Sequence, residues 1–350
     1  NSIQREINKS PETFIFELLQ NASDYPDRAW NNKVYVSFKI TANYLLFCHS
    51  GAAFKVNNVH SICSVNESDK SDSIDKIGFK GIGFKSVFKD CNFAYIKSGG
   101  YSFRFDSSKF VTEKPYQIIP IWTEPSEMAT EIVETTIFKN SSVSIALKPR
   151  RREKLDEYHV ILDRLFTDDR ILLFLPNIEN AKIITPTGFQ ESQKNLDEYE
   201  MGSELVLIPH NIREWINKEI DDNESVVPEK YYDIQSSVIQ FATSRSSKQI
   251  LKTSDAVLYN YLPTKVNLGF DFLINGDFIP DGTREFFHNI KWNDFLIEQS
   301  GFLFLKWIRS IGLKKAERNA GNFKFNRNYL SIIPDFTIIE NQIIDERNKY

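Results

Sequence analysis

Two short motifs in this sequence combine residue types and spacings that could do chemistry. Gly78, Gly81 and Gly83 lie within six residues, at the start of an apolar run. Glycine lets several backbone N–H groups turn toward one anion, and a helix that follows adds its positive end. Upstream, residues 17–24 offer an acid, an amide and a second acid at helical spacing. Together the two motifs predict a nucleotide-binding site.

Two better-known glycine loops are excluded by spacing. A P-loop needs Gly, four residues and then Gly-Lys-Ser/Thr, whereas here Phe84 separates Gly83 from Lys85. A dinucleotide-binding loop needs a preceding strand and a third glycine where this chain has Ser86, and the preceding segment 66–75 is polar. The loop therefore belongs to another class of phosphate-binding loop.

A helix has to position the upstream acids and amide. Ser10 followed by Pro11 predicts its start, because a serine hydroxyl caps the first turn and proline has no N–H to lose there. A solvated polar face is the common alternative for an amphipathic helix. Because the segment carries no lysine or arginine, we expect Glu17, Asn21 and Asp24 to line a cleft. They lie opposite a predicted buried stripe of Ile15, Leu18, Leu19 and Ala22.

In a site that hydrolyses a nucleotide, each of these three side chains would have a different chemical role. Mg²⁺ keeps most of its waters and takes one or two protein oxygens, so the Asn21 carboxamide is a sufficient protein ligand. Glu17, one turn earlier, is spaced to deprotonate the water that attacks the terminal phosphoryl group. Asp24 would support the base end of the pocket or its ordered waters.

In this order, the motifs resemble the GHKL ATPase superfamily of gyrase, heat-shock chaperone, histidine kinase and MutL type. The resemblance is strongest to the chaperone-like branch of sacsin and NO VEIN, which has many bacterial members, so a bacterial source is expected. It extends over most of the chain. The segments that carry it are Ser10-Pro11-Glu12, residues 17–22, residues 78–88, residues 275–278, Arg284-Glu285 and Trp292-Asn293.

The resemblance implies a fold and an activity. The fold class is α+β: a Bergerat-type α/β sandwich over residues 1–149, with a mixed, largely antiparallel sheet covered by helices, and an α/β transducer-like domain with a C-terminal helical and strand extension over residues 150–350. The activity is slow hydrolysis of ATP to ADP and phosphate with Mg²⁺, in which Glu17 is the general base. ATP would order a lid and drive a domain switch in a larger protein, with phage defence as one setting.

The resemblance also implies which residues hold ATP. Where the superfamily usually has Asp-x-Gly-x-Gly to meet adenine, this chain has His49-Ser50-Gly51-Ala52-Ala53-Phe54, in which only Gly51 matches, so selection of adenine over guanine is left open. Arg284 would act as a catalytic cation at the terminal phosphate, although an ion pair with Glu285 is the alternative. The predicted nucleotide-binding set is Asn21, Asp24, His49, Gly51, Phe54, Gly78, Lys80, Gly81, Ile82, Gly83, Phe84, Lys85, Ser86 and Thr136.

Alternating and helical apolar patterns predict the elements around these motifs. The predicted strands of the first domain are 34–40 paired with 44–48, 94–105 with a turn at Gly99-Gly100, 135–137 and 142–147. A helix is predicted over 153–166. In the second domain we expect α/β segments at 171–176, 182–185 and 205–208, a strand at 270–278, a turn at 281–284 and a helix from 292 toward 313.

Composition limits the remaining function classes. The 350 residues are 41% hydrophobic, enough for two domains with cores. A net charge of −4 argues against nucleic acid as a partner, and the basic run 148–152 is expected to be solvated. Three cysteines and the lack of an apolar span predict a cytoplasmic protein without a membrane partner. Zinc held by Cys48, His49, His60 and Cys63 is disfavoured by their spacing.

Other functions agree less well with these residues than ATP hydrolysis does. The main alternative is a nucleotide-binding interaction scaffold without significant turnover, and the pairing of Glu17 with Asn21 argues against it. Histidine kinase activity is disfavoured because none of the five histidines has a phosphoacceptor setting. A DNA-repair role would need a basic groove. The predicted partners are ATP and ADP; dimerisation on ATP binding and the effector are left open.

Overall fold

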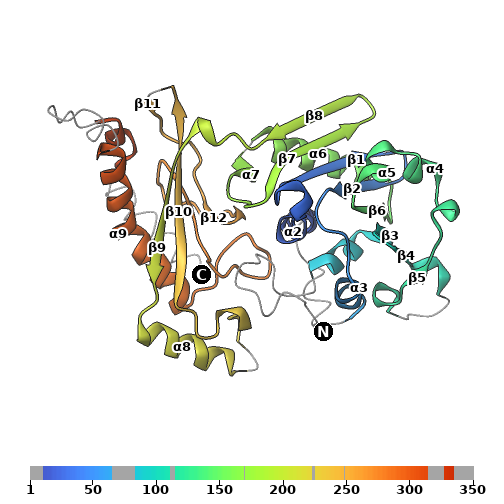
Figure 1. Cartoon of the computed structure of the whole chain (residues 1–350), viewed down its shortest axis with the longest axis horizontal. Coiled ribbons are helices and arrows are strands. Elements are labelled where there is room, and N and C mark those ends of the chain that lie inside the picture. Colours follow the sequence, from blue (N-terminus) through green and yellow to red (C-terminus); the bar gives the residue numbers. More distant parts are fainter. Residues whose placement is uncertain are drawn as a thin grey trace. The chain divides into compact units, whose positions relative to one another are not determined.

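The computed structural model describes residues 11–64, 83–110, 115–168, 170–222, 225–247, 249–313 and 327–334. It divides into two compact units, Asn1–Lys194 and Asn195–Tyr350. Each unit has its own β-sheet with helices packed on it (Figure 1). The α+β class is confirmed at this level. The predicted boundary after residue 149 does not coincide with the division after Lys194.

The first unit is built on an eight-stranded sheet in the order β5-β4-β3-β6-β2-β1-β7-β8. Neighbouring strands are antiparallel except β1 and β7, which are parallel. The predicted pairing of 34–40 with 44–48 and the turn at Gly99-Gly100 are confirmed. The strands are β1 (Val34–Ile40), β2 (Leu45–His49), β3 (Cys91–Ser98), β4 (Tyr101–Asp106), β5 (Ile121–Trp122), β6 (Val143–Pro149), β7 (Ile178–Thr185) and β8 (Gly188–Gln193).

The helices of the first unit cover both faces of this sheet, which is why every residue of β2 is buried. The predicted start at Pro11 and the predicted helix over 153–166 are confirmed. The helices are α2 (Pro11–Asp24), α3 (Val56–Cys63), α4 (Thr130–Val133), α5 (Thr136–Asn140), α6 (Lys154–Thr167) and α7 (Arg170–Leu173), with 3-10 helices η1 (Arg28–Trp30), η2 (Gly83–Lys89), η3 (Ser107–Lys109), η4 (Tyr116–Ile118) and η5 (Pro125–Glu127).

One face of the sheet carries α2 and α6. Phe38 and Phe47, cross-strand neighbours on β1 and β2, have ring centroids 4.9 Å apart. Phe166 of α6 packs on Phe38 at 5.8 Å. Phe14 of α2 meets Tyr158 of α6 edge to face at 5.1 Å, so α2 lies on the same side as α6.

The opposite face carries α4 and α5. Leu46 of β2 pairs with Ala146 of β6, which pairs with Tyr95 of β3, and Phe138 of α5 stacks on Tyr95 at 5.8 Å. The prediction of a strand at 135–137 is therefore wrong, because α5 begins at Thr136. β-Branched residues favour strands locally, but a run of three is too short to distinguish a strand from a helix. Burial of Phe138 against Tyr95 decided in favour of the helix.

The hairpin of β7 and β8 joins the first sheet. Segment 182–185 was predicted to lie in the second domain, and this is wrong, because β7 pairs along β1 from Val34 to Lys39. Ala181 and Ile183 of β7 are buried by this pairing and by α6. The short apolar alternation of β7 indicated a strand, but its partner strand lies far away in the sequence.

The second unit has a six-stranded sheet in the order β11-β10-β14-β12-β13, with β9 paired to β10. The predicted helix from 292 toward 313 is confirmed as α9, whereas the strand predicted at 270–278 is only the short β14. The elements are β9 (Tyr199–Leu207), β10 (Ser236–Ser246), β11 (Gln249–Ile250), β12 (Leu258–Asn260), β13 (Leu262–Pro263), β14 (Leu273–Asn275), α8 (His210–Ile220), α9 (Lys291–Leu313), η6 (Leu196–Glu198), η7 (Glu229–Tyr231) and η8 (Arg327–Ile332).

Helix α9 packs across β9 and β10, as Figure 1 shows. Trp307 of α9 stacks on Phe241 of β10 with 5.2 Å between ring centroids. A side chain at Gly202 of β9 would collide with the Trp307 ring, so this glycine permits the close approach of helix and sheet. Of the helices that the structure describes, none has the length and hydropathy needed to cross a bilayer.

Candidate functional site

Helix α2 is buried on almost every side, beyond the predicted stripe. Ile15, Leu18, Leu19 and Ala22 are each at most 1% exposed, which confirms the stripe. Glu17 on the other side is only 7% exposed, and Asn21 and Asp24 are half-buried. Glu17 therefore lies inside the fold of the first unit, whereas Asn21 and Asp24 keep part of their surface exposed. The predicted cap Ser10 lies outside the described residues.

The end of α2 is joined to the turn that follows β2. The backbone N–H of Ala52 donates to the carbonyl of Tyr25 at 2.7 Å. The backbone of Gly51 comes so close that a Cβ there would lie 2.5 Å from the same oxygen. A residue larger than glycine would push the turn away from the helix. Asp24, the neighbour of Tyr25, is thereby held beside the His49–Gly51 turn.

His49 ends β2 inside this junction. It is 5% exposed, and its Nδ1 accepts the backbone N–H of Gly51 at 3.2 Å. Its ring centroid is 5.6 Å from that of Phe47, on the sheet face that α2 and α6 cover. Burial lowers the pKa of His49 to about 4, because the charged imidazolium loses its hydration there. The imidazole is therefore neutral at physiological pH.

The tail of the glycine motif packs against α2. Gly78, Lys80, Gly81 and Ile82 lie outside the described residues, so their predicted phosphate contacts stay predictions. From Gly83 onward the chain forms η2, which contacts α2. This confirms that a helical run follows the loop, although it is a 3-10 helix. The motifs of α2, of the His49–Gly51 turn and of the glycine-loop tail thus meet on one face of the first sheet.

Phe84 and Lys85 of η2 point in different directions. Phe84 belongs to the aromatic core, with its ring 6.0 Å from Phe88 and 6.5 Å from Phe105. Its predicted contact with nucleotide would compete with this packing. Lys85, also buried, donates to the backbone carbonyl of Ser64, just beyond the end of α3. This contact places the ammonium of Lys85 at the junction of η2 and α3, and Ser86 beside it is half-buried.

Phe54 is anchored at the far end of the turn. Its backbone N–H donates to Oγ of Ser98 at 2.9 Å, and that hydroxyl donates to the carbonyl of Ser142 at 3.1 Å. The segment after His49 is thus attached to α2 at Ala52 and to the ends of β3 and β6 at Phe54. Two attachments so close together fix the course of this turn.

Thr136 is not brought to this junction. It is exposed in the first turn of α5, on the sheet face opposite α2 and His49. The resemblance put Thr136 in the predicted nucleotide-binding set, and the strand expected at 135–137 is replaced here by the start of α5. We therefore leave Thr136 out of the site.

Arg284 lies in a tight turn of the second unit. Its φ is +62°, and its backbone N–H donates to the carbonyl of Asp281 at 3.2 Å. The carboxylate of Asp281 accepts the Thr283 hydroxyl at 2.7 Å and so stabilises the turn. Glu285, the alternative partner of Arg284, pairs with Lys265 at 2.8 Å. The proposed contact of Arg284 with phosphate stays a prediction.

The other motif of the second unit holds its fold together. The indole N–H of Trp292 donates to the Asp277 carbonyl at 2.8 Å. Asn293 accepts the Ile279 N–H at 2.8 Å and donates to the Ile279 carbonyl at 2.9 Å. The Asp277 carboxylate accepts the Tyr261 hydroxyl at 2.7 Å. These bonds attach the start of α9 to the segment after β14, which gives the motif a structural role.

Two buried polar side chains of α2, those of Gln20 and Ser23, were not predicted to belong to the site. Gln20 is fully buried, and neither atom of its amide has a hydrogen-bond partner among the described residues. The hydroxyl of Ser23, one turn later, is also buried and has no hydrogen-bond partner among the described residues. A buried polar group without a partner is costly, so water or a ligand is the expected partner. Both residues lie within the 17–24 motif, which was the signal that could have singled them out.

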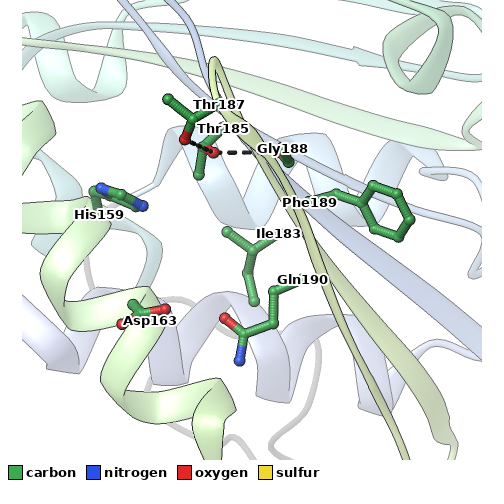
Figure 2. Close-up of a pocket in the computed structure, with 8 residues that line it drawn as sticks. All are labelled: His159, Asp163, Ile183, Thr185, Thr187, Gly188, Phe189 and Gln190. Atoms are coloured by element: carbon green, nitrogen blue, oxygen red, sulfur yellow. Dashed lines mark hydrogen bonds between the residues drawn. The ribbon is translucent and has the colours of Figure 1, made fainter.

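A separate pocket of about 230 Å³ lies between α6 and the β7–β8 hairpin (Figure 2). Val36 of β1 pairs with both His49 and Ala181, so His49 lies level with the middle of β7. The pocket instead lies around Thr185, at the end of β7. The ring of Phe189 is turned away from His159, and Lys182 lies over it at 4.1 Å. The pocket is lined by His159, Asp163, Ile183, Thr185, Thr187, Gly188, Phe189 and Gln190.

The sulfur and imidazole groups weighed for zinc do not form a cluster. Within the described ranges, no three His, Cys, Asp or Glu side chains come together at metal-binding distance. Burial raises the pKa of the Cys48 thiol to about 12, so it stays protonated. Cys91 behaves in the same way for the same reason.

Comparison with known proteins gives one distant relative in sequence. No family model matches the chain. The chain is 23% identical to Protein NO VEIN of Arabidopsis thaliana over 351 residues, which is 95% of this chain and 12% of that protein. Among solved structures, the N-terminal domain of a DNA repair protein matches 75% of this chain and 82% of its own, at 11% identity and a TM-score of 0.39. By sequence, most of this chain is thus a distant homologue of a short part of NO VEIN.

Proposed function

We propose that this chain is a GHKL-type ATPase module with a Bergerat-type first domain, which binds and hydrolyses ATP with Mg²⁺ and uses the nucleotide to switch conformation. The observation that carries the proposal is the junction at Tyr25. Its carbonyl holds the Gly51–Ala52 turn against the end of α2, while η2 packs on the same helix. Residues 17–24, the 49–51 turn and the tail of the glycine motif, which are far apart in the sequence, thus all contact one helix or its end.

The side chains of α2 offer the groups that ATP hydrolysis needs. Glu17 is 7% exposed, so its carboxylate is sheltered from bulk water, as suits a base that activates one bound water. Asn21, half-buried one turn later, offers the single amide oxygen that Mg²⁺ accepts beside phosphate oxygens. Bound Mg²⁺ would neutralise charge on the phosphates. Gln20 and Ser23 offer further polar atoms for ordered water.

The switch would act within a larger protein. The chain corresponds to only 12% of the length of NO VEIN, so an ATP-driven change here would be transmitted to other domains. A chaperone-like protein of the bacterial cytoplasm, with phage defence as its setting, is the form of this proposal that the superfamily resemblance favours. Homodimerisation on ATP binding is part of it.

Magnesium-dependent binding of ATP tests the proposal directly. In calorimetry with and without Mg²⁺, the chain should bind ATP more tightly with the metal, and Asn21→Ala should abolish that difference. Asn140→Ala, at an exposed position of α5, is the matched control and should behave like wild type. If Asn21→Ala keeps the full magnesium dependence, the assignment is wrong. Binding without turnover in the wild type would instead favour the interaction scaffold.

A further inference from the structure

The tautomer of His49 is determined by its surroundings. The backbone N–H of Gly51 can only donate, and it donates to Nδ1 at 3.2 Å, so Nδ1 carries a lone pair. A neutral imidazole has one N–H, which must then be on Nε2. Burial lowers the pKa of His49 to about 4, which keeps the ring neutral at physiological pH. His49 thus offers its remaining nitrogen as a hydrogen-bond donor.

The tautomer is not free to exchange at low cost. Moving the proton to Nδ1 would set two N–H groups against each other, because the Gly51 N–H has no other acceptor in this arrangement. Gly51 itself cannot turn aside, since its backbone is packed against the carbonyl of Tyr25. None of the described residues accepts a hydrogen bond from Nε2. The donor therefore needs an acceptor from outside the described residues, as a ligand can provide.

We propose that His49 meets the purine base as an N–H donor, so that 6-oxopurine triphosphates such as GTP and ITP bind this site at least as tightly as ATP. The inference rests on the proposed function, in which residue 49 stands where the superfamily places an aspartate against the group at C6 of the base. An aspartate accepts from the 6-amino group of adenine. The Nε2–H of His49 cannot accept, but it can donate to the O6 oxygen of guanine or hypoxanthine.

The difference in affinity between the bases comes from two donors that face each other, and not from a contact that is simply absent. A donor facing the amino group of adenine leaves two N–H groups without acceptors, whereas a donor facing O6 satisfies both partners. Such a mismatch changes affinity by about tenfold. The preference would reverse if Nε2–H instead faced N1, which accepts in adenine and carries a proton in guanine and hypoxanthine. The direction of selectivity therefore reports which edge His49 meets.

Two variants that differ in one group separate donor from acceptor. In His49→Asn the amide oxygen can take the Gly51 N–H, as Nδ1 does, and the NH₂ group remains a donor toward the base. In His49→Asp a carboxylate oxygen takes the same N–H, and the second oxygen is an acceptor. The two substitutions shorten the side chain equally, so a change of reach or a small loss of packing affects them alike.

Dissociation constants for ATP, GTP and ITP, measured with Mg²⁺ on the whole chain, test the inference. Wild type and His49→Asn should bind ITP and GTP at least as tightly as ATP, and His49→Asp should favour ATP over ITP by about tenfold. A wild type that favours ATP by tenfold overturns the inference and leaves the proposed function standing. So does identical selectivity in the Asn and Asp variants. If none of the three nucleotides binds the wild type, the proposed function fails first. Should His49→Asp not fold, wild type and His49→Asn still decide the direction of selectivity.

Discussion

Ala52 donates its backbone N–H to the carbonyl of Tyr25 at 2.7 Å, and this bond fixes the turn after β2 against the end of α2. Gly51 precedes Ala52 in this turn, and its backbone lies so close to Tyr25 that there is no room for a side chain. The bond thereby joins the segment after His49 to the residue that follows Asp24.

Gly51→Ala should destabilise the first unit and weaken ATP binding. The new methyl group would lie 2.5 Å from the Tyr25 carbonyl, and forcing the turn outward costs about 1–3 kcal/mol. Urea unfolding gives the stability change, and calorimetry gives the affinity. Gly100→Ala is the matched control, because a Cβ at Gly100 meets no atom within 4 Å. Equal urea midpoints for the two variants would show that the junction can accommodate the added methyl group.

Glu17→Gln should keep ATP affinity and lose hydrolysis. The amide has nearly the same shape as the carboxylate but cannot take a proton from water, and loss of a general base typically costs about 10²–10⁴-fold in rate. Phosphate release under saturating ATP measures the effect, with nucleotide affinity of the same variant as the control. Unchanged turnover would remove Glu17 from the chemistry.

Arg284→Ala should leave ADP affinity nearly unchanged and slow ATP turnover by about 10²-fold, if its guanidinium stabilises charge at the terminal phosphate. Arg284→Lys keeps a cation and should recover part of the rate. A residue that only stabilises the 281–285 turn gives another pattern. In that case Arg284→Ala lowers the melting temperature without nucleotide and reduces ADP and ATP binding equally.

Acid should destabilise the chain through His49. The folded-state pKa is lowered from 6.5 to about 4, so between these values the unfolded chain binds a proton that the folded chain does not. Stability therefore falls as pH falls from 6.5 toward 4, by up to roughly 3 kcal/mol from this group. Above pH 6.5 the group contributes no pH dependence.

His49→Asn is the control for this pH effect, because its amide does not titrate. Urea unfolding of wild type and variant at several pH values between 4 and 7 should give curves that converge at acid pH and separate toward neutrality. Parallel curves would mean that His49 is protonated in the folded state as readily as in the unfolded one.

Local sequence determined several elements of the fold by itself. Pro11 begins α2, because a proline is favourable only in the first turn, and the stripe that includes Ile15 and Leu19 is buried as its period requires. The turn at Gly99-Gly100 followed in the same way, since Gly99 has a φ of +57° that few other residues adopt. These features depend on neighbours in the chain.

Tertiary structure decided what local pattern could not. The run 135–137 has strand-like composition, yet packing of Phe138 on Tyr95 made it a helix and placed Thr136 on the wrong face for the site. The segment 182–185 was predicted to lie in the other domain, because nothing local indicates that its partner is β1. Long-range partners are chosen by the burial of whole faces, which no short window contains.

The candidate site shows the same division between sequence and structure. Residue types and spacing singled out Glu17, Asn21 and the 49–51 turn, because phosphate and metal chemistry demands particular groups. The sequence did not reveal that α2 would be buried on almost every side, or that Gln20 would be left without a partner among the described residues. Nor could it fix the tautomer of His49, because that depends on the Gly51 N–H at 3.2 Å, in a turn that is hydrogen-bonded to Tyr25, a residue far away in the sequence.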